Sequence, residues 1–221
     1  KSRDIMVKVF GNKILDLKYY WFNRFTLNGI DLVISRTGWS SELGYEIFLL
    51  NSSQGNDLYN HLMKVGEPMG LRPGHTSTIR RIEGGMLSYH ADMTINTNPL
   101  ELGLDKFIDL DKGFDFVGKD ALISILDKGI KRKQVGIIID DDPMPGPNTR
   151  FWNIYVNDSL VGKVTSAVYS PRLDKNIALG MVQTDYSNIG QKLSIDNGIK
   201  KLHAVITEKP FYDPNKSLTK A

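Results

Sequence analysis

Residues 34–50 read Ile-Ser-Arg-Thr-Gly-Trp-Ser-Ser-Glu-Leu-Gly-Tyr-Glu-Ile-Phe-Leu-Leu, and this run predicts two strands joined by a polar bend. The first strand ends in Leu32 to Ser35, which is apolar and rich in β-branched residues. Tyr45 to Leu50 forms a second apolar run, and Gly38 and Gly44 bracket the bend between the two. The rest of the chain is interpreted outward from this strand pair.

Glu46 is the residue that does not fit a plain strand pair, because it directly precedes the apolar residues Ile47-Phe48-Leu49-Leu50. A carboxylate among large apolar side chains is unfavourable unless donors satisfy it. If Glu46 faces a cavity, its two oxygens suit a flat heterocycle with paired N–H donors, such as a pterin. If the strand alternates in the ordinary way, Glu46 points to water. The stretch alone leaves both interpretations open.

The run Ser35-Arg-Thr-Gly-Trp-Ser-Ser-Glu-Leu-Gly-Tyr-Glu-Ile47 resembles the signature of the glycine-cleavage T-protein, or aminomethyltransferase, family. The family pattern is Arg-Thr-Gly-Tyr-Thr-Gly-Glu-x-Gly-x-Glu-Ile, and its last Glu holds the pterin ring of tetrahydrofolate. The resemblance therefore implies tetrahydrofolate as the cofactor and Glu46 as its ligand. It also implies that Trp39 lines the folate pocket, where most members have Tyr, and makes Tyr20 a further candidate pocket aromatic.

Three later segments carry the same resemblance. One holds Arg81 and Glu83, which match the family's Arg-Ile-Glu-Gly-Gly and which we interpret as structural ion-pairing residues. The second is Phe114-Asp-Phe-Val-Gly-Lys-Asp-Ala-Leu122, which enters a short helix. The third, Gly162-Lys-Val-Thr-Ser-Ala-Val-Tyr-Ser-Pro171, matches the C-terminal barrel of the family.

Lys106 stands where T-proteins proper carry Trp, and Lys at this place is associated with the dimethylsulfoniopropionate demethylase branch. Its ammonium would offer a cation to a carboxylate or an anionic intermediate, whereas the simpler interpretation is an exposed loop lysine. Ser77 replaces an Arg that binds folate in T-proteins, and a ligand-contacting C-terminal Tyr has no clear counterpart near Asn215. The family's key Asp falls upstream of Lys1, so no catalytic residue is predicted here.

The resemblance implies an α+β fold, with ferredoxin-like α/β modules of the folate-binding fold followed by a C-terminal antiparallel β-barrel. From Gln134 onward, period-two alternation with frequent turns independently favours a small barrel or sandwich. The six segments expected to be strands are 135–139, 153–156, 161–168, 177–182, 192–195 and 201–207. We expect a partial folate-binding module at residues 1–95, a connecting segment with a short helix at 96–131, and the barrel with a frayed tail at 132–221. The N-terminal half of the fold would precede this chain.

Several local predictions can be checked directly. Asn28-Gly29 is expected to form a two-residue hairpin turn. Ser2 is expected to cap a helix that Gly11 ends, and Tyr19, Trp21 and Phe22 are expected mainly in the core. A second helix is predicted from Thr76 or Ser77 to about Tyr89, with Gly84-Gly85 in its interior. Because glycine is unfavourable inside a helix, such a pair suggests that a backbone or ligand presses against it.

Composition bounds the remaining possibilities. The net charge of +3 over 221 residues is too small to argue for nucleic acid, and the absence of cysteine excludes disulfides and thiol nucleophiles. No apolar run approaches the roughly 20 residues of a membrane span. The four histidines lack metal-ligand spacing, so no metal site is predicted. We expect a cytoplasmic protein without a membrane partner.

Three functions remain open. The first is methyl transfer to tetrahydrofolate from a sulfonium or amine donor, of the dimethylsulfoniopropionate demethylase kind. The second is the aminomethyltransferase reaction, which would need a lipoyl carrier protein as partner. The third is a folate-binding regulator without turnover.

Overall fold

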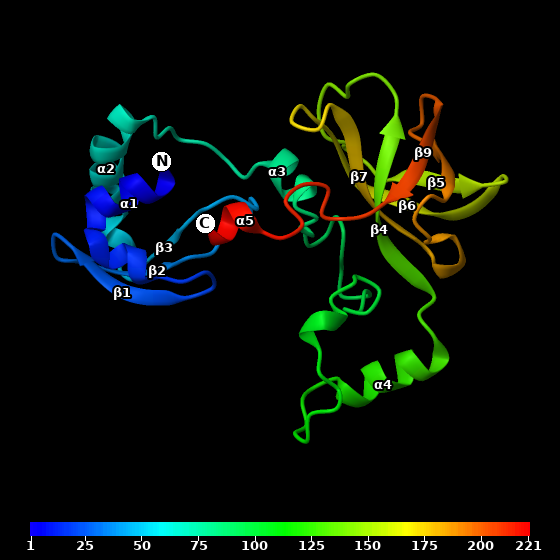
Figure 1. The fold of residues 1–221 in the computed structure, drawn as a ribbon, viewed down its shortest axis with the longest axis horizontal. Coiled ribbons are helices and arrows are strands. Elements are labelled where there is room, and N and C mark those ends of the chain that lie inside the picture. Colours follow the sequence, from blue (N-terminus) through cyan, green and yellow to red (C-terminus); the bar gives the residue numbers. More distant parts are fainter. The chain divides into compact units, whose positions relative to one another are not determined.

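A computed structural model of the chain describes residues 1–221, and it divides into two compact units. The first unit comprises residues 1–80 and 215–221, and the second comprises residues 81–214. The first is an α/β layer and the second contains a closed β-barrel (Figure 1). The predicted α+β fold class is confirmed. No helix is long and apolar enough to cross a membrane.

A three-stranded antiparallel sheet organises the first unit, in the order β1-β2-β3. Its strands are β1 (Phe22–Leu27), β2 (Ile30–Ser35) and β3 (Glu46–Leu49). The predicted turn at Asn28-Gly29 joins β1 to β2, since Leu27 pairs with Ile30. The pairing of β2 with β3 confirms the strand, bend and strand predicted for residues 34–50.

Helices cover one face of this sheet. They are α1 (Ser2–Phe10), η1 (Asn12–Asp16), η2 (Ser52–Gln54), α2 (Gly55–Gly66) and η3 (Glu67–Met69). Met6 of α1 and Leu58 of α2 join a buried cluster with Phe25, Leu32 and Ile34 of the strands. Gly11 ends α1 as predicted. The cap is different, because Ser2 lies inside the helix and Lys1 occupies the N-cap without a side-chain hydrogen bond.

The barrel of the second unit closes in the order β4-β7-β6-β5-β8-β9, with every neighbouring pair antiparallel. The strands are β4 (Arg132–Asp140), β5 (Trp152–Val156), β6 (Ser159–Ser170), β7 (Lys175–Gln183), β8 (Lys192–Asp196) and β9 (Lys201–Thr207). A short helix, η5 (Thr184–Tyr186), follows β7. All six segments predicted from period-two alternation are strands, since alternation is the direct consequence of a sheet with one buried face.

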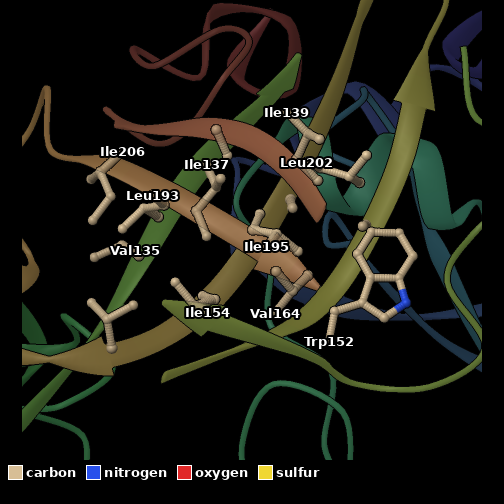
Figure 2. Packing of buried hydrophobic residues seen from close by; sticks show 14 of the residues in the cluster. Val135, Ile137, Ile139, Trp152, Ile154, Val164, Leu193, Ile195, Leu202 and Ile206 are labelled. Carbon is tan, nitrogen blue, oxygen red and sulfur yellow. The ribbon is translucent and has the colours of Figure 1, made fainter. Parts of the chain in front are cut away.

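The barrel interior is filled by β-branched and aliphatic side chains. Figure 2 shows Ile137, Ile154 and Ile195 directed into the space that the strands enclose, with Trp152 among the surrounding side chains. The three isoleucines are fully buried. Fully burying one such side chain contributes about 1.5–3 kcal/mol. Because buried side chains fill the space between the strands, the interior is a packed core rather than a ligand channel.

A polar layer lies on the outer wall of the barrel. Arg81 of α3 (Thr78–Glu83) places Nη1 2.8 Å from Asp92 Oδ2, and its Nη2 donates to Ser166 Oγ at 2.8 Å. The hydroxyls of Thr165 and Ser166 both donate to Asp92 Oδ1. A β-bulge in β6 breaks the alternation between Val164 and Ser166, which lets two consecutive residues reach one carboxylate.

Glu83 makes a second connection from α3 to the barrel, because it accepts from Ser170 Oγ at 2.6 Å and lies 3.5 Å from an Arg172 nitrogen. The interpretation of Arg81 and Glu83 as structural residues is therefore confirmed. Arg81 thus bonds to Asp92 and Ser166, whereas Glu83 accepts from Ser170 at the end of β6.

The helix predicted over residues 77–89 is wrong in length, because α3 ends at Glu83. Gly84-Gly85 follows the helix instead of lying inside it, and Gly85 adopts a left-handed φ of 64°. A Cβ on Gly85 would lie 3.5 Å from Pro210 Cα, so the predicted close backbone is present. Two short elements complete the unit, η4 (Asp105–Phe107) and α4 (Lys119–Lys128), and α4 has no buried residue.

The prediction of a frayed C-terminal tail is also wrong. Residues 217–220 form α5 (Ser217–Lys220), and Thr219 is buried against the first unit. The buried guanidinium of Arg36 donates to the Thr219 carbonyl at 2.9 Å. The tail is ordered because it supplies an acceptor to a buried cation, a contact that local sequence patterns do not reveal.

Candidate functional site

One face of the β1-β2-β3 sheet is not covered by the helices of its unit, and Glu46 lies on it. The register places Phe22, Ser35 and Glu46 side by side in one row across the three strands. Arg24, Val33 and Phe48 form the next row on the same face. The alternate residues Ile47 and Leu49 pack against the buried cluster on the other side. We call the face that carries these two rows the open face.

The carboxylate of Glu46 is oriented by two hydroxyls. Thr37 Oγ1 donates to Glu46 Oε2, and Ser35 Oγ lies 2.6 Å from Thr37 Oγ1. Since the single hydroxyl proton of Thr37 goes to Glu46, Ser35 is the donor to Thr37. The relay fixes one carboxylate oxygen and leaves the other, Oε1, as an acceptor for a ligand.

Of the two interpretations of Glu46, the structure shows the one in which the side chain points to water. Glu46 is exposed, because strand alternation turns Ile47 and Leu49 inward and Glu46 outward. The apolar residues that follow Glu46 in sequence therefore belong to both faces of the sheet. What remains of the site prediction is an oriented carboxylate on an open surface, and its role in binding folate stays a prediction.

Aromatic side chains flank that carboxylate. Phe22 is 70% exposed and Phe48 is 52% exposed, and both lie on the open face with Glu46. Trp21 is also exposed, so the prediction that Trp21 and Phe22 belong to the core is wrong. Exposed aromatic rings of this kind are unusual on a finished surface and are suited to stack on a flat ligand or to be covered by protein.

Tyr20 and Trp39 lie at the same end of the sheet as Glu46. The Tyr20 N–H donates to the Arg36 carbonyl at 3.1 Å, one residue beyond the row that contains Glu46. The Tyr20 ring is 70% exposed and lies 4.3 Å from that of Tyr19. Trp39 belongs to the bend between β2 and β3 and is partly exposed. These two residues are accessible to a ligand at this end of the sheet.

Lys106 belongs to the second unit, where it lies in η4 and is exposed. Its ammonium lies 5.2 Å from the centroid of the Phe107 ring. This is a local cation–π contact of modest strength, and Lys106 retains its capacity to meet an anion.

The histidine next to Asp92 does not form an acid–base pair with it. His90 is exposed and its ring packs against Tyr89, whereas Asp92 is buried in the network with Arg81. No three metal-ligating side chains come together in the structure.

Sequence reasoning overlooked Ser35 and Thr37 as site residues. Both lie within the quoted signature, but a hydroxyl has no pattern that distinguishes a relay from an ordinary turn residue. The one available indication was their position, since Ser35 and Thr37 directly precede a bend and the return strand after it begins at Glu46. Only the β2-β3 register brings the three oxygens together.

These residues fit one edge and one face of a reduced pterin. The free oxygen of Glu46, together with the second lone pair of Oε2, can accept two parallel N–H bonds. The exposed rings at the same end of the sheet supply an apolar platform. These residues fit the pterin ring and no further part of a folate, because Arg24 is the only cation in the two rows.

Two family models match the chain. The model described as "GCVT N-terminal domain" matches residues 1–112, and the model described as "Glycine cleavage T-protein C-terminal barrel domain" matches residues 132–213. The second match begins at the first residue of β4.

Curated relatives have similar sequences over nearly the whole chain. A dimethylsulfoniopropionate demethylase from Ruegeria pomeroyi is 33% identical, over 89% of this chain and 53% of the relative. An aminomethyltransferase from Thermoanaerobacter pseudethanolicus is 32% identical, over 97% of this chain and 58% of the relative. The chain thus spans just over half the length of these relatives.

A solved structure has a similar fold. The glycine cleavage system aminomethyltransferase T from Bartonella henselae superposes with a TM-score of 0.76 at 21% sequence identity. The superposition covers 95% of this chain and 56% of that chain.

Proposed function

Because this chain belongs to the glycine-cleavage T-protein family, we propose that its protein transfers a one-carbon group to tetrahydrofolate. The observation that carries the proposal is the Glu46 carboxylate, oriented by Ser35 and Thr37 beside exposed aromatic rings. Tetrahydrofolate, when bound, supplies the nitrogen that accepts the one-carbon group.

The residues of this chain act by binding and orienting the heterocycle. Glu46 accepts the paired N–H donors of the pterin, and charge assistance makes such bonds stronger than neutral ones. The rings of Trp39 and Tyr20 exclude water from the faces of the heterocycle. This chain offers no candidate for the proton-transfer step, so its contribution is positioning.

We infer that the donor is a methylated sulfonium or amine of the dimethylsulfoniopropionate class. Lys106 supports this inference, since an exposed ammonium at this family position can meet a carboxylate-bearing donor. Ser77 supports it too: its hydroxyl accepts from the Arg80 N–H at 3.3 Å and stands where T-proteins use an Arg for folate. We further propose that the protein acts in the cytoplasm.

The aminomethyltransferase reaction is the second candidate, because several relatives named aminomethyltransferase match nearly the whole chain at the same identity. That reaction would require a lipoyl carrier protein as the donor.

The two candidates are separated by offering donors to the full chain. The full-length protein is incubated with tetrahydrofolate and either dimethylsulfoniopropionate or an aminomethyl-loaded lipoyl carrier protein. We expect 5-methyltetrahydrofolate from the sulfonium donor. Methylenetetrahydrofolate formed only with the carrier protein would replace the first candidate by the second. Saturable folate binding without product from either donor would overturn both and leave a binding protein.

A further inference from the structure

A cavity of about 560 Å³ opens at the end of the barrel where β4 and β8 finish. Its walls come from the loop 141–150 between β4 and β5 and from the turn between β8 and β9. The apolar side chains in its lining are Pro143, Met144, Pro145, Pro147, Trp152 and Ile199. Small-molecule sites are typically concave, with volumes of roughly 300–1,000 Å³, apolar walls and a few polar groups. This cavity has that character.

The loop that forms the cavity is held in one shape by two asparagines. Asn176 of β7 donates to two backbone carbonyls of the loop at 2.9 Å each, and it accepts from the Met144 N–H at 3.0 Å. The Asn148 N–H donates to the Ala167 carbonyl at 3.0 Å, and Asn148 Oδ1 accepts from the Ala167 N–H at 2.6 Å. Three prolines fix φ along the same loop. The cavity is therefore formed before any ligand binds.

Arg150 is a cation in the cavity wall without an anionic partner. Its Nη2 donates to the Asn197 carbonyl at 2.9 Å, and the guanidinium forms no ion pair. A Cβ on Gly198 would lie 2.7 Å from the guanidinium carbon, so the guanidinium packs directly on the backbone of Gly198. The group is thus held in place, and most of its N–H donors remain available to a ligand.

The indole N–H of Trp152 is a second donor without a partner. The side chain is only 9% exposed and belongs to the barrel core, yet its N–H makes no hydrogen bond and keeps accessible surface. In Figure 2 the indole nitrogen lies on the edge of the ring that faces away from Ile154 and Ile195. Because the rest of Trp152 is enclosed in the core, its accessible part is the part that lines the cavity. A buried donor of this kind is seldom left unsatisfied.

One carboxylate of the cavity is also unpaired. Lys200 Nζ lies 2.6 Å from Asp141 Oδ1 and compensates that charge, whereas Asp142 is exposed and forms no ion pair. The lining therefore presents an unpaired anion, Asp142, and an unpaired cation, Arg150. A simple anion would be repelled by the first and a simple cation by the second, but a zwitterion complements both.

We propose that this cavity binds a small methylated zwitterion, in which a carboxylate carries a quaternary ammonium or sulfonium group. The carboxylate accepts from Arg150 and from the indole N–H of Trp152, and the onium group lies toward Asp142. A free ammonium would need acceptors for three N–H donors, whereas methylated onium groups need none and suit walls of proline and methionine. No residue assigned to folate lines this cavity, so binding here does not depend on the folate reaction.

Titration of the full chain, followed by ¹⁵N–¹H NMR of the tryptophan indoles, tests the site. Trp21→Phe and Trp39→Phe assign the Trp152 signal by elimination. Glycine betaine and dimethylsulfoniopropionate are added in parallel, and we expect a saturable shift of the Trp152 N–H with both. The more tightly bound of the two identifies the preferred onium group.

Three comparison ligands separate the parts of the zwitterion. Sodium acetate carries the anion alone, tetramethylammonium chloride the cation alone, and glycine an unmethylated ammonium. Sodium chloride corrects for ionic strength. Each should bind at least about tenfold more weakly than the better methylated zwitterion, because each lacks one charge or adds unsatisfied donors.

Variants locate the two charged ends. Arg150→Gln should weaken the affinity for glycine betaine about tenfold or more, since charge-assisted bonds are lost. Lys163→Gln is the matched control and should not change it, because Lys163 lies 4.3 Å from the Phe151 ring centroid and outside the cavity lining. Asp142→Asn should weaken glycine betaine but not acetate, a difference that general loss of structure could not produce.

Four results would overturn the proposal. The Trp152 signal shows no saturable shift with either methylated zwitterion. Acetate binds as tightly as glycine betaine, which would leave a plain anion site. Glycine binds more tightly than both methylated compounds. Glycine betaine binds equally well to the wild type and to Arg150→Gln.

Discussion

Individual residues of this chain owe their properties to the strand face on which they lie. Glu46 and Ile47 are neighbours in sequence, yet one is an oriented surface carboxylate and the other packs on the core. Gln134 and Val135 divide in the same way, between the outer wall of the barrel and its interior. The chemistry of each site therefore follows from the pleat of a strand.

Lys209 gives the stability of the protein a defined pH dependence. Its pKa is about 8 in the folded chain against an ordinary 10.5, so between these values the unfolded chain binds more protons than the folded one. Stability should therefore rise with pH above about 8, because the burial penalty of the ammonium is fully present below that pH and is relieved above it.

Urea unfolding across this window tests the effect, with Lys209→Met as the comparison because methionine has no titrating group. The free energy of unfolding of the variant should lack the rise. The comparison ends near pH 10, since burial raises the pKa of Tyr19 from 10.0 to about 12 and its contribution falls as pH rises above 10. Parallel pH profiles for wild type and variant would contradict the assignment of a buried ammonium.

At the scale of elements, the connection between α3 and the barrel depends on Arg81. Its guanidinium and the Asp92 carboxylate are both almost fully buried and 2.8 Å apart. Arg81→Met should lower the stability of the barrel by about 3–5 kcal/mol, because it leaves Asp92 buried without its cation. Fluorescence of Trp152 reports on the barrel if Trp21 and Trp39 are replaced by Phe.

Arg80→Met is the control in the same helix. The Arg80–Glu42 pair is 3.5 Å apart and partly exposed, so its loss should change stability by about 1 kcal/mol or less. Equal destabilisation by the two variants would mean that burial of the Arg81 pair is not what matters.

The sequence predicted those elements that follow from a local pattern, such as strand alternation or a turn dipeptide. Alternation located all six barrel strands, and the Asn28-Gly29 turn and the return strand from Glu46 were also found. Long-range contacts decided the failures. The helix after Ser77 ends early, with Gly85 next to Pro210, and the tail is held by Arg36, more than 180 residues earlier.

The candidate site was predicted only in part, for the same reason. Glu46 follows from a signature, but the Ser35–Thr37 relay exists only once β2 pairs with β3. The Arg150–Asn197 contact joins residues 47 positions apart and has no local signal at all.

At the scale of the whole molecule, the open face of the sheet is the surface best suited to be covered by a ligand or by further protein. It exposes Phe22 and Phe48 next to an oriented carboxylate, whereas a surface strand would ordinarily carry polar residues there. The chain spans 53% of one curated relative and 58% of another, so a complete member of the family has additional protein with which a ligand site can be built.

The most direct test of the account is tetrahydrofolate binding to the full chain and to its Glu46→Ala variant. We predict that the variant loses about tenfold in affinity or more, since unpaired pterin donors cost about 1–3 kcal/mol. Asp31→Ala is the matched control, because Asp31 lies on the same sheet face and accepts from Thr26 as Glu46 accepts from Thr37. Equal affinity for wild type and Glu46→Ala, or an equal loss in Asp31→Ala, would contradict the assignment of Glu46 as the pterin ligand.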